Sequence, residues 1–157
     1  MLFSSDQRNL AFHAMSEAED RTLRYYCIPP HRWQHLKYDL LTCRDGEWEP
    51  LPDSALARVQ RLHQIRPRKS HLDFYRIQLN DPSILSAARR ENLAADLYPF
   101  LVYILTHEMV HLVRLSTILP EEPECREAEE SRVRGVACRI LGGALDQRMR
   151  PILDRFQ

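Results

Sequence analysis

The sequence predicts a single α+β domain that is mostly helical, with a small antiparallel sheet placed before one long apolar helix. Two short segments in the first half alternate apolar and polar residues as strands do, whereas the remaining apolar positions mostly follow helical spacing. A chain of 157 residues with 44% hydrophobic residues can bury one real core but is short for two. We therefore expect residues 1–157 to form one compact domain.

The first elements follow from apolar spacing and from turn residues. A helix is expected near residues 5–25, before the break at Pro29-Pro30, because proline cannot continue a helix. Residues 36–42 predict a strand. Asp45-Gly46 is typical of a hairpin turn, which would lead into a returning strand at residues 47–49.

The middle of the chain is expected to alternate helix and strand. Residues 55–65 suit a short helix, and residues 71–79 predict a second clear strand. That strand would place Tyr75, Ile77 and Leu79 on one face, because side chains alternate across a strand. Asn80-Asp81-Pro82 then predicts the start of another helix, since proline is favoured in the first helical turn.

The most informative segment is an apolar helix that contains the pattern H-E-x-x-H at residues 107–111. Apolar residues cover its other sides, so the helix is expected to be buried all round. Pro99 is expected to kink or restart the helix before this pattern, because it lacks a backbone donor.

His107 and His111 lie one helical turn apart, so both imidazoles can reach a single metal ion. Glu108 follows the first histidine by about 100° around the axis, close enough to accept a proton from a water that the metal activates. The alternative is a set of hydrogen-bonded core residues. Burying three polar groups without partners would cost several kcal/mol, so the pattern favours a Zn²⁺ site.

A catalytic zinc site needs a third protein ligand, and the downstream sequence narrows the choice. No histidine follows His111, and the extended metzincin pattern would require glycine at Arg114 and histidine at Thr117. The same absence disfavours peptidases of the SprT type. A downstream carboxylate remains.

Helical periodicity selects among the downstream glutamates. A helix is expected over residues 123–141, ended by Gly142-Gly143, with Val133, Val136 and Ile140 as its apolar face. Glu129 lies within about 20 to 40° of that face, Glu130 about 100° away and Glu127 on the opposite side. We therefore predict Glu129 as the third ligand and keep Glu130 as the second candidate. An inward salt bridge from Glu129 to Arg114 or Arg132 is the alternative role.

The segment His107-Glu108-Met109-Val110-His111, followed by Glu129-Glu130-Ser131-Arg132-Val133, resembles the gluzincins over residues 98–142. Its spacing is similar to that of the ImmA/IrrE-type metallopeptidases, and Glu129 would match that family's glutamate. Glu130 and Ser131 depart from the small residue and asparagine found there, and Val133 replaces an aromatic residue. The resemblance implies a compact zincin-like peptidase fold with His107, His111 and Glu129 as zinc ligands.

The expected activity is hydrolysis of a peptide or protein substrate, with Glu108 as general base. Tyr103, Tyr75, His71 and Arg134 are chemically able to stabilise the oxyanion. A substrate peptide could pair with the edge of the strand at residues 72–79 if that edge is exposed. The alternative function is a zinc-binding regulatory or interaction module without turnover; retention of Glu108 favours the enzyme.

The charge and composition of the chain limit the kinds of partner that we expect. The net charge is zero and the pI is about 7.1, so no global field favours nucleic acid or an anionic membrane. A basic stretch, residues 58–69, is expected to be a solvated surface.

The start of the chain lacks a signal peptide, and the apolar run at residues 97–106 is too short to cross a bilayer. The four cysteines show no C-x-x-C spacing. These features predict a cytoplasmic protein and leave the oligomeric state open.

Overall fold

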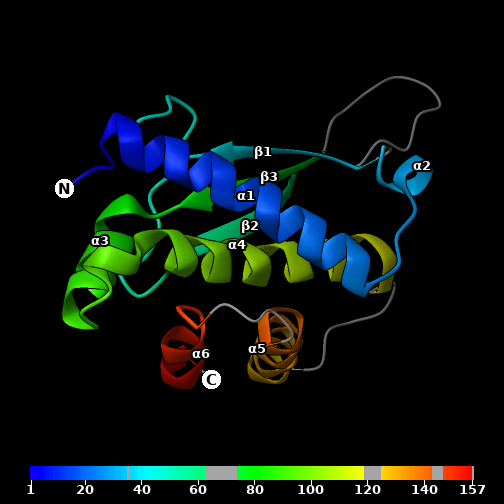
Figure 1. Cartoon of the computed structure of the whole chain (residues 1–157). Helices are drawn as coiled ribbons and strands as arrows, with labels where there is room; N and C mark the ends of the chain where they lie inside the picture. Colours follow the sequence, from blue (N-terminus) through cyan, green and yellow to red (C-terminus); the bar gives the residue numbers. More distant parts are fainter. Residues whose placement is uncertain (35, 63–73, 119–124, 143–146, 157) are drawn as a thin grey trace.

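The fold was analysed in a computed structural model that describes residues 1–34, 36–62, 74–118, 125–142 and 147–156. It confirms a mostly helical α+β chain with a small sheet placed before the apolar helix (Figure 1). The elements in order are α1 (Ser5–Tyr25), α2 (Pro30–Trp33), β1 (Lys37–Leu41), β2 (Ala57–Leu62), β3 (Phe74–Leu79), α3 (Asp81–Arg90), the 3₁₀ turn η1 (Ala94–Asp96), α4 (Leu97–Val113), the π-helical turn η2 (Arg114–Ile118), α5 (Arg126–Gly142) and α6 (Arg150–Phe156).

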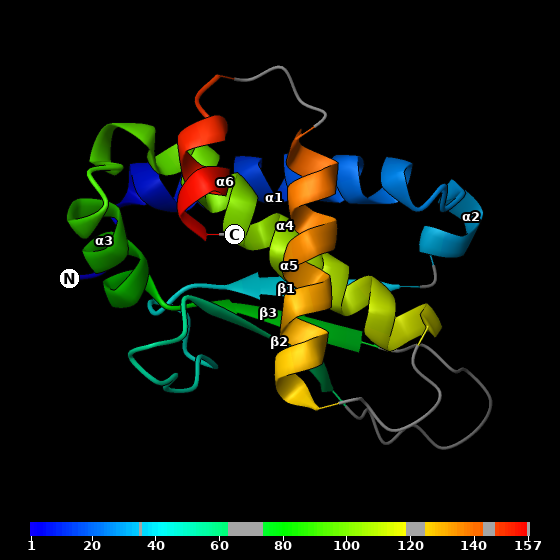
Figure 2. The same cartoon turned by 90° about the horizontal axis from the view of Figure 1, so that it is seen from below.

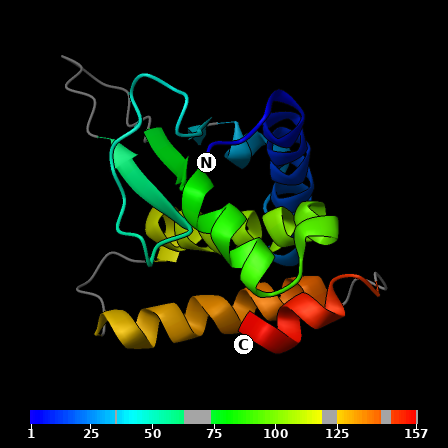
Figure 3. The same cartoon turned by 90° about the vertical axis from the view of Figure 1, so that its left-hand side faces the viewer.

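Helix α4 is the centre of the molecule. It packs against α1, β2, α5 and α6, and lies between a layer made of α1 with the sheet and a layer made of α5 with α6 (Figures 1 and 3). Leu101, Leu105 and Leu112 are fully buried, which confirms that the helix is covered on all sides. Pro99 lies in the first turn of α4, where a missing backbone donor is tolerated, so it belongs to the start of the helix.

The sheet is mixed, whereas an antiparallel sheet was expected. Its strand order is β1-β3-β2, with β1 parallel and β2 antiparallel to β3. Tyr75, Ile77 and Leu79 of β3 are all fully buried, as the alternation predicted. Because β3 is central, the proposal that its edge receives a peptide is wrong.

Two predictions in the first half also fail. Residues 57–62, inside the expected helix at 55–65, form β2, because pairing with β3 outweighs a weak helical preference. Residues 47–49 form no returning strand. Instead the Asp45 carboxylate accepts the Thr42 backbone N–H at 2.7 Å, and the Trp48 indole donates to the Leu79 carbonyl at 2.9 Å.

The helices around α4 have clear local causes. Helix α1 begins with a reciprocal capping box between Ser4 and Gln7 and spans the predicted 5–25. Helix α3 begins at Asp81 with proline in its first turn, as expected. Helix α6 was not predicted; its Phe156 ring stacks on Phe100 of α4 with centroids 5.2 Å apart. No helix in the described part of the chain is long and apolar enough to span a membrane.

Candidate metal centre

The two histidines of the H-E-x-x-H pattern present their rings on one side of α4. The ring centroids of His107 and His111 lie 4.9 Å apart, and each side chain is 16% exposed. Both rings are therefore mostly buried but still reach the protein surface. The apolar α4 therefore holds two imidazoles at the wall of a cleft.

Glu130 of α5 completes the group. Its two carboxylate oxygens lie 3.2 Å from the Nε2 atoms of His107 and His111, one oxygen against each ring. Three ligand atoms from these residues lie within 4.8 Å of one another, and no other such group occurs among the residues that the structure describes. Ligand atoms around a tetrahedral Zn²⁺ are separated by about 3.4 Å, given metal–ligand bonds of about 2.1 Å. This group could therefore hold a metal ion.

Glu129, the predicted third ligand, has a different partner. Its carboxylate accepts the Arg114 Nε–H at 2.6 Å and Nη2–H at 2.9 Å. The side chains of Arg114 and Glu129 are 7% and 15% exposed, so this is a largely buried ion pair. Glu129 does point inward, but to the salt bridge that was its alternative role. The structure brings the second candidate, Glu130, to the histidines.

The spacing of polar residues along α4 explains why Glu129 and Glu130 have different partners. His107, His111 and Arg114 follow one another at intervals of four and three residues, so they form one row on the helix surface. The adjacent Glu129 and Glu130 meet this row at different points, Glu130 at the histidines and Glu129 at the arginine. The apolar face of α5 marks the direction of the core but does not locate the histidines. Arg114, seven residues after His107, is the sequence signal that could have assigned Glu129 to an ion pair and Glu130 to the histidines.

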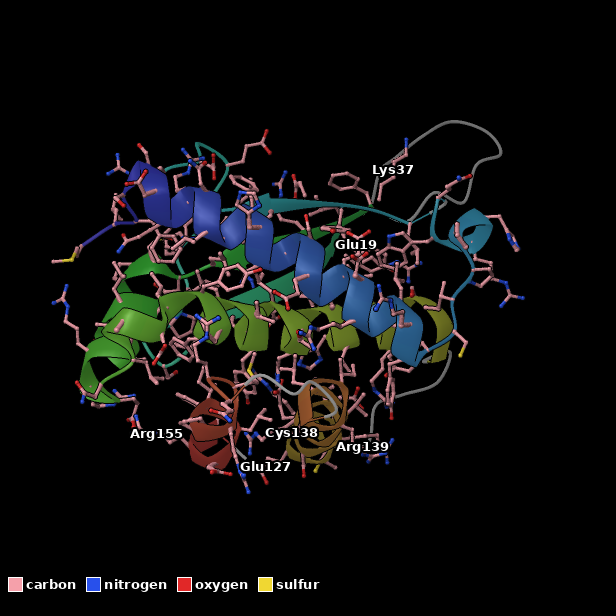
Figure 4. All side chains as sticks on the ribbon, viewed as in Figure 1. Glu19, Lys37, Glu127, Cys138, Arg139 and Arg155 are labelled. Carbon is pink, nitrogen blue, oxygen red and sulfur yellow. The ribbon has the colours of Figure 1, made fainter. Side chains whose placement is uncertain are left out.

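Glu127 lies on the opposite side of α5, as its helical position predicted. The side chain is exposed and points away from α4 (Figure 4). It therefore takes no part in the donor group and provides a matched control for its two neighbours.

The electrostatics of the group favour metal-binding protonation states. Burial lowers the pKa of His111, which favours the neutral imidazole. The hydrogen bond to His107 lowers the pKa of Glu130 to about 2, so that side chain is a carboxylate. Hydrogen bonds from Arg114 likewise lower the pKa of Glu129. Neutral imidazole and ionised carboxylate are the forms that coordinate zinc.

Glu108 lies beside the donor group and faces β2. The side chain is 7% exposed, and burial raises the pKa of its carboxyl to about 7. The backbone N–H of Val59 in β2 donates a hydrogen bond to it. The strand that had been predicted as a helix is therefore part of the site.

A cleft of about 530 Å³ contains these residues. Its walls come from α4, α5, β2 with the residues before it, and Phe156 of α6; α5 crosses α4, and its first turns run past β2 (Figure 2). Tyr103 and Arg134, both named as oxyanion candidates, line the cleft, and the Tyr103 hydroxyl donates to the Phe156 carbonyl at 3.1 Å. Tyr75 is fully buried, and His71 lies outside the described residues.

Comparisons with protein-family models, with curated proteins and with solved structures find no match to this chain. The resemblance to the gluzincins therefore rests on residues 98–142 alone.

The geometry predicts that Glu130, and not Glu129, determines metal affinity. Glu130→Ala should lower the zinc content of protein dialysed against a weak chelator by tenfold or more, an order of magnitude typical of losing one contact at a metal site. Glu129→Ala should retain close to one zinc per chain, measured by atomic emission. Glu127→Ala is the control. Loss of zinc in Glu129→Ala, with full zinc in Glu130→Ala, would refute the assignment.

The Arg114–Glu129 pair should instead determine stability. Arg114→Met leaves a buried carboxylate unpaired and should lower the free energy of unfolding by about 3 kcal/mol. The double variant Arg114→Met/Glu129→Met removes both charges and should be destabilised less than Arg114→Met alone. Urea unfolding of these metal-free proteins and of Glu129→Met gives the values of the complete cycle. Additive losses would show that the two side chains are not coupled.

Proposed function

We propose that this protein is a zinc-dependent peptidase. The observation that carries the proposal is the placement of His107, His111 and Glu130 as one donor group, with Glu108 beside it in the same cleft. Two imidazoles and a carboxylate are a ligand set used by catalytic zinc sites, and a neighbouring carboxylate is the usual proton acceptor there.

His107, His111 and Glu130 would hold the ion. When bound, zinc supplies Lewis acidity, which activates a water molecule and polarises the scissile carbonyl. Glu108 accepts the proton of the attacking water and transfers it to the leaving amine. Glu108 is buried, and the backbone N–H of Val59 acts on its carboxylate, which places this carboxylate next to β2 in the cleft.

Strand β2 offers a place for the substrate backbone. It is an edge strand in the described sheet, and Ala57, Arg58 and Val59 line the cleft next to Glu108. An extended peptide laid along this edge could pair with main-chain groups of β2, which gives binding with little dependence on side chains. We therefore propose β2, and not β3, as the strand that pairs with a substrate peptide.

A zinc-binding regulatory module without turnover is the second candidate. The hydrogen bond between Val59 and Glu108 favours it, because a carboxylate held by the strand is less available to a water molecule. The two functions differ in a single outcome, which is whether the zinc-loaded protein hydrolyses any peptide. The cytoplasmic location stays a prediction.

Glu108→Gln should separate metal binding from catalysis. The variant should keep stoichiometric zinc, and its hydrolysis of a diverse peptide mixture should fall by about 10²- to 10⁴-fold, the usual contribution of a general base. Cleavage is measured by mass spectrometry of the products. A chelator should abolish wild-type cleavage, and added Zn²⁺ should restore it.

Glu127→Gln serves as the control and should equal the wild type in zinc content and cleavage rate. Undiminished cleavage by Glu108→Gln would contradict the assigned base. Wild-type protein with full zinc but no cleavage of any peptide in the mixture would favour the regulatory module.

A further inference from the structure

Helix α5 presents a row of charged side chains to the cleft. Arg126, Glu130 and Arg134 are spaced four residues apart, and all three line the cleft. Side chains at this spacing lie on one face of a helix. The metal-binding carboxylate is thus flanked by an arginine on each side, about 6 Å away along the helix axis.

The two flanking arginines are available to a ligand. Both are exposed, and neither forms an ion pair with any residue that the structure describes. Arg58, the third arginine of the cleft wall, differs: its Nη2 atom donates to Gln78 at 2.7 Å and lies 3.3 Å from a Glu49 carboxylate oxygen. Arg126 and Arg134 are therefore the cationic groups of the described cleft wall without such partners.

The acidic residues of the cleft wall have other contacts, although the charge of Arg126 contributes to the low pKa of Glu130. They are Glu108, which is bonded to β2, and Glu130, which contacts both histidines. A bound divalent cation would add further positive charge. The described cleft wall thus carries three arginines against two glutamates, in a chain with no net charge overall.

A solvated helix face is the simpler explanation of exposed arginines. Helix α5 also has Arg139, which is labelled in Figure 4; it is exposed and is not among the residues that line the cleft. Arg126 and Arg134 differ from it in facing the cleft on either side of a metal-binding residue. Guanidinium groups bind carboxylates through paired hydrogen bonds, which a neutral side chain cannot replace.

We propose that the cleft selects peptides with acidic side chains on both sides of the scissile bond, with Arg126 and Arg134 each holding one carboxylate. This inference rests on the proposed peptidase function for its scissile bond. A peptide is favoured over nucleic acid because β2 offers main-chain groups for pairing, whereas the Tyr103 and Phe156 rings of the cleft wall pack against each other with centroids 5.6 Å apart.

The test measures binding apart from turnover. Fluorescence anisotropy of zinc-loaded Glu108→Gln protein compares three labelled peptide mixtures, which are identical except that glutamate, glutamine or lysine flanks a random central pair. The glutamate set should bind roughly five- to tenfold tighter than the glutamine set, and added salt should weaken that preference. The lysine set should bind most weakly.

Charge reversal identifies the residues responsible. Arg126→Glu/Arg134→Glu in the same background should prefer the lysine set, whereas Arg139→Glu should keep the original order. The milder Arg126→Gln/Arg134→Gln variant should lose the preference without reversing it. Zinc content and urea unfolding show whether each variant retains its fold.

Equal binding of the glutamate and glutamine sets would overturn the inference, and wild-type cleavage of neutral peptides would still support the peptidase. Selective binding of the glutamate set with no wild-type cleavage of any set would support the acidic ligand and refute the peptidase. Displacement of bound peptide by single-stranded DNA at lower concentration than by free acidic peptide, dependent on Arg126 and Arg134, would overturn the assignment to peptides.

Discussion

The candidate site depends on the contact between α5 and one row of side chains on α4, which consists of His107, His111 and Arg114. Glu130 bridges His107 and His111, and the neighbouring Glu129 is held by Arg114. The buried ion pair joins the first turn of α5 to the end of α4, and the next residue along α5 carries the carboxylate that contacts the histidines. Adjacent residues of α5 thus make a buried ion pair and complete a group that could hold a metal ion.

This arrangement explains why α4 tolerates so many polar groups in an apolar helix. His107 and His111 lie at a cleft wall, Glu108 is bonded to β2, and Arg114 is paired with a carboxylate. These charged or ionisable groups of α4 therefore have partners or lie at the cleft, as the cost of desolvation requires, whereas the buried Thr106 hydroxyl has no hydrogen-bond partner among the described residues. The polar residues of α4 therefore contribute both to the candidate site and to the packing around this helix.

Part of this could be predicted from sequence, and the limits have physical causes. Helical spacing located α1 and α4, and alternation identified the buried face of β3, because these patterns are local. The strand β2 was missed because its pairing with β3 is a tertiary contact. Periodicity in α5 showed that Glu129 points inward, yet one helix alone does not show where its neighbour's histidines lie. The difference between Glu129 and Glu130 is set by the crossing of two helices.

The central claim is that a metal ion is held between α4 and Glu130. Anomalous diffraction at the zinc edge, from crystals of the zinc-loaded protein, tests it most directly. The account predicts one peak within bonding distance of the His107 and His111 Nε2 atoms and of a Glu130 oxygen, with Glu129 still paired to Arg114. A peak bonded to Glu129, or full zinc occupancy elsewhere in the chain, would contradict it.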